Sequence, residues 1–113
     1  MTTPEIPNPH RLADQRSIAL HRGVAAALRE KPQLLSRARA RVEGWIADGS
    51  VPLVYAQGWA ELLSLPLDRL TDLLVDPGEQ MQALRQCSPF AGALDPKTRW
   101  RILRETRLQQ TQP

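Results

Sequence analysis

Few side chains in this 113-residue sequence have the type and spacing that catalysis or metal binding requires. His10 and His21 would lie about 16 Å apart along one helix, too far to share a metal ion. Cys87 has no histidine nearby in sequence to act as its base. Asp68 and Asp72 are one helical turn apart, so the two carboxylates could bind one metal ion. The same spacing is typical of a solvated acidic face. The sequence has no glycine-rich phosphate loop and no recognisable Ser/His/Asp set.

These observations predict a protein without enzyme activity, bound metal or cofactor. We expect both histidines to lie at the surface and the Cys87 thiol to be partly buried. A single cysteine also excludes an internal disulfide. The longest apolar run is too short to span a membrane, so we expect no membrane contact and a cytoplasmic protein.

The basic residues gather at the two ends of the sequence. The net charge is +5 over residues 1–41, −6 over residues 42–96 and +4 over residues 97–113. Most of the basic residues are arginines, whose planar guanidinium makes bidentate contacts with carboxylates and phosphates. This layout favours an acidic protein surface or nucleic acid as the partner of the two ends. It is equally typical of ends that fold back onto an acidic middle.

Prolines and apolar periodicity predict an all-α single domain of about six short helices. Asn8-Pro9, Asp76-Pro77, Ser88-Pro89 and Asp95-Pro96 each place a good N-cap residue before a proline, which is favoured at the start of a helix. Apolar residues recur at helical spacing over about 9–30, 33–47, 53–63, 67–74, 81–87 and 100–108. Gly49 is a helix stop signal. We expect a flexible arm over residues 1–8, a helical domain over 9–107 and a disordered tail over 108–113.

The apolar stripes also predict which residues form the core and how the first helix packs. The apolar stripe of that helix is thin and rich in alanine, so we expect the helix either to pack antiparallel to the helix at 33–47 or to lie on a partner chain or along a phosphate backbone. Phe90 lies in a loop between two proline caps, where it either fills the junction of the last two helices or is an exposed anchor for a partner. The predicted core comprises Trp45, Trp59, Leu62, Leu70, Leu74, Leu84, Trp100 and Leu103.

A DNA-binding regulator is one hypothesis for the function, because the sequence pI is about 9.8. Residues 66–87 have the length of a helix-turn-helix, and Gln80, Gln82, Arg85 and Gln86 on its second helix could read base edges. The same segment is net acidic, which suits a polyanion poorly. The DNA contacts would instead come from the arginine-rich ends, namely Arg11, Arg37, Arg39, Arg41 and Arg107.

The stretches at residues 13–22 (ADQRSIALHR) and 85–105 (RQCSPFAGALDPKTRWRILRE) resemble small bacterial proteins that act as the non-enzymatic partner in toxin–antitoxin pairs. The resemblance extends over about residues 9–107. It implies a small helical antitoxin that binds a toxin enzyme and covers its active site. The sequence departs from common antitoxins because it has no separate DNA-binding domain linked to a disordered toxin-binding tail, which puts repression of its own promoter in doubt.

We therefore expect a non-enzymatic module that binds a toxin or another protein, with the DNA-binding regulator as the alternative and self-association left open. Aromatic and arginine side chains dominate the energetics of protein interfaces. Basic ends would also steer the chain towards an acidic partner surface. The predicted contact residues are Arg16, His21, Arg22, Phe90, Trp100, Arg101 and Arg104.

Overall fold

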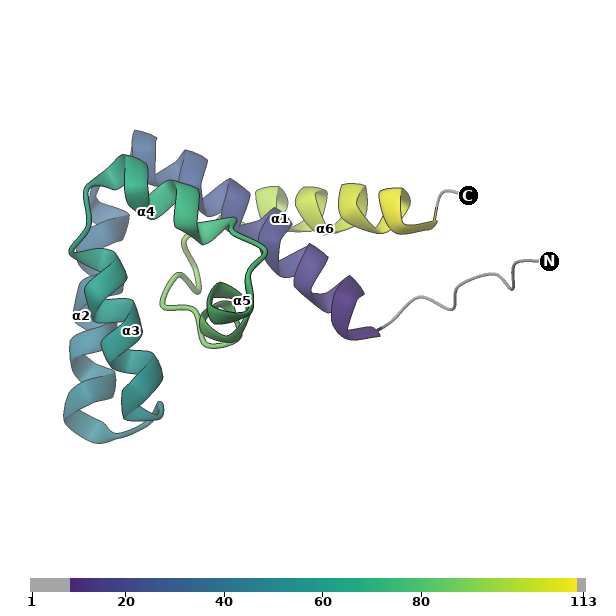
Figure 1. The fold of residues 1–113 in the computed structure, drawn as a ribbon. Coiled ribbons are helices and arrows are strands. Elements are labelled where there is room, and N and C mark those ends of the chain that lie inside the picture. The colour runs from purple at the N-terminus through teal and green to yellow at the C-terminus, as the bar shows by residue number, and fades with distance from the viewer. Residues whose placement is uncertain (1–8, 112–113) are drawn as a thin grey trace.

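The computed structural model describes residues 9–111, and this part of the chain forms six α-helices without a strand (Figure 1). The prediction of an all-α single domain with about six short helices is confirmed. The domain is elongated, with extents of 53 × 29 × 24 Å. The helices are α1 (Pro9–Glu30), α2 (Gln33–Asp48), α3 (Leu53–Leu63), α4 (Leu67–Leu74), α5 (Glu79–Arg85) and α6 (Pro96–Thr111).

Helices α2 and α3 form an antiparallel hairpin that projects from the rest of the domain (Figure 1). The turn begins at Gly49, which has a φ of +70° and donates its backbone N–H to the Trp45 carbonyl at 2.9 Å. Glycine adopts this left-handed conformation without the steric cost that a β-carbon brings. Pro52 then precedes the first residue of α3. The predicted helix stop at Gly49 is confirmed.

Helix α1 packs antiparallel to α6 and also against α4 (Figure 1). Gly23 lies at the close approach of α1 to α6, where a β-carbon would lie 2.6 Å from Cδ1 of Ile102 and that side chain would have to shift. Further along, the side-chain amide of Gln110 donates to the Leu12 carbonyl at 3.1 Å. The prediction that α1 packs mainly on α2 is wrong. The small-residue face of α1 fits α6 instead, and α2 pairs with α3.

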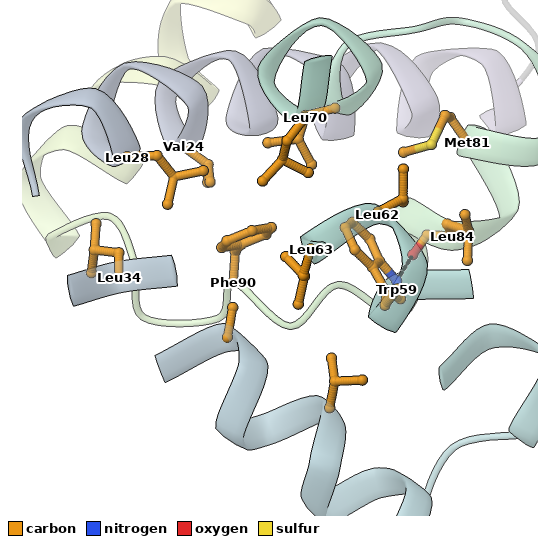
Figure 2. Close-up of a cluster of buried hydrophobic side chains, with 13 residues drawn as sticks. Val24, Leu28, Leu34, Trp59, Leu62, Leu63, Leu70, Met81, Leu84 and Phe90 are labelled. Atoms are coloured by element: carbon orange, nitrogen blue, oxygen red, sulfur yellow. Dashed lines mark hydrogen bonds between the residues drawn. The ribbon is translucent and has the colours of Figure 1, made fainter. Parts of the chain in front are cut away.

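The core is centred on Trp59, which is fully buried in α3. Its Nε1–H donates to the Leu84 carbonyl at 2.9 Å, which satisfies the one polar atom of the indole (Figure 2). The Phe90 ring meets the Trp59 ring edge-on, with centroids 5.9 Å apart. Figure 2 shows both rings among aliphatic side chains that come from different helices, including Leu28, Leu34, Leu63 and Leu70.

The predicted core is confirmed at five of its eight residues, and Trp45 packs against this core. Five of its members are buried: Trp59, Leu62, Leu70, Leu74 and Leu84. Trp45 and Leu103 are partly buried. The prediction of Trp100 as a core residue is wrong, because its side chain is 62% exposed. The face of α6 that meets α1 is formed by its neighbours Ile102, Leu103 and Thr106, so the Trp100 side chain points to solvent.

The prediction of a disordered tail from residue 108 is wrong for residues 108–111, which belong to α6. The hydrogen bond from Gln110 to α1 holds this last turn in place. Residues 112–113 and the predicted arm at residues 1–8 lie outside the described residues. Between residues 9 and 111, none of the helices combines the length and the apolar composition of a membrane-spanning helix.

Candidate functional site

The most unusual surface of the molecule is the side of α6 that points away from α1. We call it the α6 outer face. Trp100 is 62% exposed and Leu108 is 54% exposed, so two large apolar side chains are left in water. The guanidinium carbon of Arg104 lies 5.3 Å from the centre of the Trp100 ring, a cation–π contact. The α6 outer face comprises Lys97, Trp100, Arg101, Arg104, Arg107 and Leu108, all of them exposed.

Two features of the sequence position this face. Residues spaced three and four apart share one side of a helix, so the outer face lies opposite Ile102, Leu103 and Thr106, which meet α1. The start of α6 is fixed by Asp95, whose carboxylate accepts the Thr98 N–H at 2.9 Å and the Thr98 hydroxyl at 2.8 Å. These hydrogen bonds lower the pKa of the Asp95 carboxyl. Glu105 is the only acidic residue in α6, so the face is strongly basic.

Three predicted contact residues, Trp100, Arg101 and Arg104, therefore lie together on the α6 outer face. Two others, His21 and Phe90, are only 6% exposed, so their prediction as partner contacts is wrong. Phe90 is buried, as the alternative placement requires, but it fills the space between α2, α3 and the loop that precedes α6 and not the junction of the last two helices (Figure 2). The expectation that His21 lies at the surface is also wrong, because its burial depends on a residue far away in the chain.

That distant residue is Ser88. The Nδ1 atom of His21 lies 2.7 Å from the Ser17 carbonyl, and its Nε2 atom lies 2.8 Å from the Ser88 hydroxyl. A carbonyl can only accept, so Nδ1 carries the proton, and in the neutral ring Nε2 accepts from the Ser88 hydroxyl. Burial lowers the pKa of His21, and the charge of Arg85 lowers it further, against the opposing effect of the Ser17 hydrogen bond. The ring is therefore neutral at pH 7.

A serine hydroxyl that donates to a neutral imidazole is also the arrangement of a nucleophile and its base. Here the imidazole is oriented by a backbone carbonyl, and its lowered pKa makes it a weak base. Ser88 also accepts the Phe90 N–H at 3.2 Å, so its oxygen is held inside the loop. These bonds tie α1 to the loop before α6 and satisfy both buried polar groups. We assign the pair a structural role.

Arg85, which the sequence suggested as a reader of DNA bases, is 3% exposed, and this prediction is wrong. Its guanidinium donates to the carbonyls of Leu74 and Asp76, at 3.2 and 2.6 Å, just past the end of α4. It also pairs with the Asp14 carboxylate at 3.1 Å. Unpaired carbonyls at the end of a helix need such donors. Arg85 therefore joins α5 to α4 and α1.

A pocket of about 510 Å³ opens between α1, the loop at residues 86–94 and the first half of α6. It brings together Arg16, a predicted contact residue, and Arg99, which no pattern in the sequence singles out. The hydroxyl-bearing residues Ser17 and Ser88 contribute to one side, and no acidic side chain is part of the lining. The other lining residues are Ala13, Leu20, His21, Val24, Arg85, Gln86, Phe90, Ala91, Gly92, Leu94 and Leu103.

The predicted nucleic-acid contacts do not form one surface. Arg39 donates to the Leu63 carbonyl at 2.8 and 3.2 Å, and Arg41 donates to the carbonyls of Pro89 and Ala91 in the loop before α6. Both guanidinium groups are thus engaged within the fold. Exposed Arg37 lies with them on α2, whereas exposed Arg11 and Arg107 lie on the α1–α6 pair. Arg22 is exposed on α1, on a different side of the helix pair from Arg16.

A second group of exposed apolar side chains lies at the open end of the α2–α3 hairpin. Val54 is 71% exposed, and Ile46, Leu53 and Tyr55 are 45%, 54% and 37% exposed. Leu53 and Tyr55 belong to an apolar stripe that the sequence predicts to face the core. They are exposed because the hairpin extends beyond the rest of the domain (Figure 1). Unlike the α6 outer face, this group has no cluster of arginines around it.

The described residues place no group of three or more histidine, cysteine, aspartate or glutamate side chains where they could hold a metal ion. Burial raises the pKa of the Cys87 thiol, which disfavours the reactive thiolate. The thiol is partly buried, as predicted. Comparison with protein-family models, curated proteins and solved structures finds no match for this chain.

Proposed function

We propose that this chain is a non-enzymatic protein-binding module that docks an acidic partner protein on the α6 outer face. The observation that carries the proposal is Trp100, 62% exposed under the Arg104 guanidinium and flanked by further arginines. Tryptophan and arginine are the residues most enriched where protein interfaces concentrate their binding energy. When a partner covers this face, Trp100 would become buried at the centre of the interface with arginines around it. The interface would then combine an apolar contact with charge complementarity.

The same surface favours a protein over nucleic acid as the partner. Trp100 and Leu108, two turns apart on one side of α6, leave two large apolar side chains exposed, which suits apolar pockets on a partner. Nucleic-acid binding draws most of its affinity from contacts between cationic side chains and phosphates. Two of the arginines predicted to bind DNA, Arg39 and Arg41, are already bonded to backbone carbonyls of their own chain.

The resemblance to antitoxins supplies a more specific form of the proposal. The partner would be a toxin enzyme, and the α6 outer face would cover its active site. Two features support this form: the resembling stretch at residues 85–105 contains the start of α6, and the exposed arginines suit a toxin whose substrate site is lined by carboxylates. Repression of its own promoter is not part of the proposal.

The test is a pull-down of the tagged chain from nuclease-treated cells of its source, analysed by mass spectrometry. Wild type is compared with Trp100→Ala and with Val54→Ala as a matched control, since Val54 is the most exposed large apolar residue of the other surface. We expect one stoichiometric protein partner that Val54→Ala retains and Trp100→Ala loses. The partner's toxicity when it is expressed alone, relieved by co-expression of this chain, would support the antitoxin form.

Two outcomes would contradict the proposal. If Val54→Ala releases the partner and Trp100→Ala does not, the docking surface is the hairpin end. If the chain retains only DNA fragments when nuclease is omitted, and their binding weakens steeply with salt, the chain is a DNA-binding protein. Thermal unfolding of both variants serves as the check that each is folded.

A further inference from the structure

We propose that the pocket between α1, residues 86–94 and α6 binds a small organic anion with an apolar body, in which a carboxylate or phosphate group meets Arg16 and Arg99. This binding site is separate from the α6 outer face. The pocket volume of about 510 Å³ falls within the range of small-molecule sites. A ligand of this size would rest on three segments that are far apart in the sequence.

The charge of the lining selects an anion. Arg16 and Arg99 come from α1 and α6, so the antiparallel pairing of these helices brings two guanidinium groups to one pocket. In the described part of the chain, neither of them is paired with a carboxylate. The nearby carboxylate of Asp14 already accepts a hydrogen bond from Arg85. Two guanidinium groups without a counter-charge favour an oxyanion between them, held by charge-assisted hydrogen bonds.

The lining contains a further donor besides Arg16 and Arg99. Arg85 is part of the pocket lining and its side chain is fully buried, yet its Nε–H has no hydrogen-bond partner among the described residues. An unsatisfied buried donor is costly, so such a group marks a place that a water or a ligand can occupy. The Nη atoms of Arg85 make three hydrogen bonds, which hold its guanidinium in a fixed position.

The apolar residues of the lining select an apolar body. They are Leu20, Val24, Leu94, Leu103 and Phe90. Gly92 has a φ of +81°, which lets the loop turn tightly beside the pocket without a side chain to fill the space. A head group at the arginines and a hydrocarbon body along the leucines would satisfy both the charged and the apolar residues of the lining. A bare inorganic ion would leave the apolar residues wet.

The experiment titrates four probes with one eight-carbon chain into the full-length protein. Octanoate and octyl phosphate are the anions, 1-octanol is the neutral control, and octyltrimethylammonium is the cationic control. Binding is followed by ¹H–¹⁵N NMR at the amides of Ser17, Ser88, Ala91 and Gly92. The variant Arg16→Gln/Arg99→Gln removes the two pocket charges. Arg22→Gln/Arg69→Gln removes the same charge from exposed residues outside the pocket.

We expect octanoate, octyl phosphate or both to shift the NMR signals of the pocket amides. The anion that binds more tightly identifies the preferred head group. The pocket variant should weaken that anion by about tenfold or more, whereas the control variant should bind like wild type. All four substituted arginines are exposed, so both variants should unfold at the wild-type temperature. The proposal is overturned if neither anion shifts these amides, if octanol or the cation binds as tightly, or if the pocket variant keeps full affinity.

Discussion

The guanidinium of Arg85 and the carboxylate of Asp14 form an ion pair at 3.1 Å that joins α5 to α1 across 71 residues of sequence. The Arg85 side chain is fully buried, and that of Asp14 is 17% exposed. A charge that is removed from water needs such a partner, because its own desolvation is costly. This pair therefore belongs to the framework that holds the central helices around the core.

Removal of Asp14 tests that role. We expect Asp14→Ala to lower the free energy of unfolding by about 3–5 kcal/mol, because it leaves the buried Arg85 without its counter-charge. Urea denaturation measures the change. The matched control is Asp68→Ala, which breaks the exposed Arg29–Asp68 pair of the same length, 3.1 Å. That change should cost no more than about 1 kcal/mol. Equal losses in both variants would show that the Asp14 pair is solvated in solution.

His21 should make the stability depend on pH. Its pKa is lower in the folded chain than the ordinary value of 6.5, so the unfolded chain binds a proton first as the pH falls. The stability that comes from neutral His21 is complete above pH 6.5 and decreases below it, by at most about 1.4 kcal/mol per pH unit. Urea denaturation between about pH 5 and 7 measures this slope.

One variant assigns that slope to its residue. His21→Gln should flatten it. Carboxyls with a lowered pKa, such as that of Asp95, also contribute to the free energy of unfolding. This contribution is lost only at more acid pH, below the ordinary pKa of 3.8. A wild-type stability that stays constant from pH 7 to 5 would contradict the burial of His21.

The two aromatic residues predicted as contacts should behave in opposite ways. Phe90→Ala should lower the free energy of unfolding by about 3–5 kcal/mol, because it empties a site in the core. Trp100→Ala should change it by less than about 1 kcal/mol, since only the exposed contact with Arg104 is lost. Urea denaturation of both variants makes the comparison. A large loss with Trp100→Ala would mean that α6 is covered by another part of the chain.

Two glycines with open space around them should respond to alanine with opposite signs. Gly44 lies within α2, and a β-carbon added there would meet no neighbouring element within 4 Å, so Gly44→Ala should stabilise the chain by about 0.5–1 kcal/mol. Gly92 is equally open but has a φ of +81°, where alanine costs about 1–2 kcal/mol. The midpoint temperature of thermal unfolding should therefore rise for Gly44→Ala and fall for Gly92→Ala.

Local signals in the sequence are enough to predict the helices. The apolar spacing, the prolines after Asp76 and Asp95, and Gly49 mark the start and end of most helices close to where they occur. Trp59 and Leu70 are predicted correctly as core because their stripes contain several apolar residues per turn. In α6 the signal is weaker, since polar Thr106 is its one fully buried residue. The prediction for Trp100 is wrong for that reason.

The candidate sites depend on contacts that no local pattern reveals. His21 is buried through Ser88, 67 residues later in the chain, and Arg85 through Asp14. Arg99 gives no local signal in the sequence, because it joins Arg16 in the lining of one pocket only after α6 has packed on α1. The three residues predicted as contacts that do lie on the α6 outer face share one short segment, in which helical spacing alone places them on one side.

The pairing of α1 with α6 also sets the order in which the chain can mature. The α2–α3 hairpin joins neighbouring segments, so it is able to form early, when loop closure is cheap. Helix α1 is synthesised first, yet its partner α6 is the last of the described helices to leave the ribosome. Until then the alanine- and glycine-rich face of α1 stays uncovered. A nascent chain that stalls before residue 96 would therefore expose that face, and would be a substrate for chaperones or proteases.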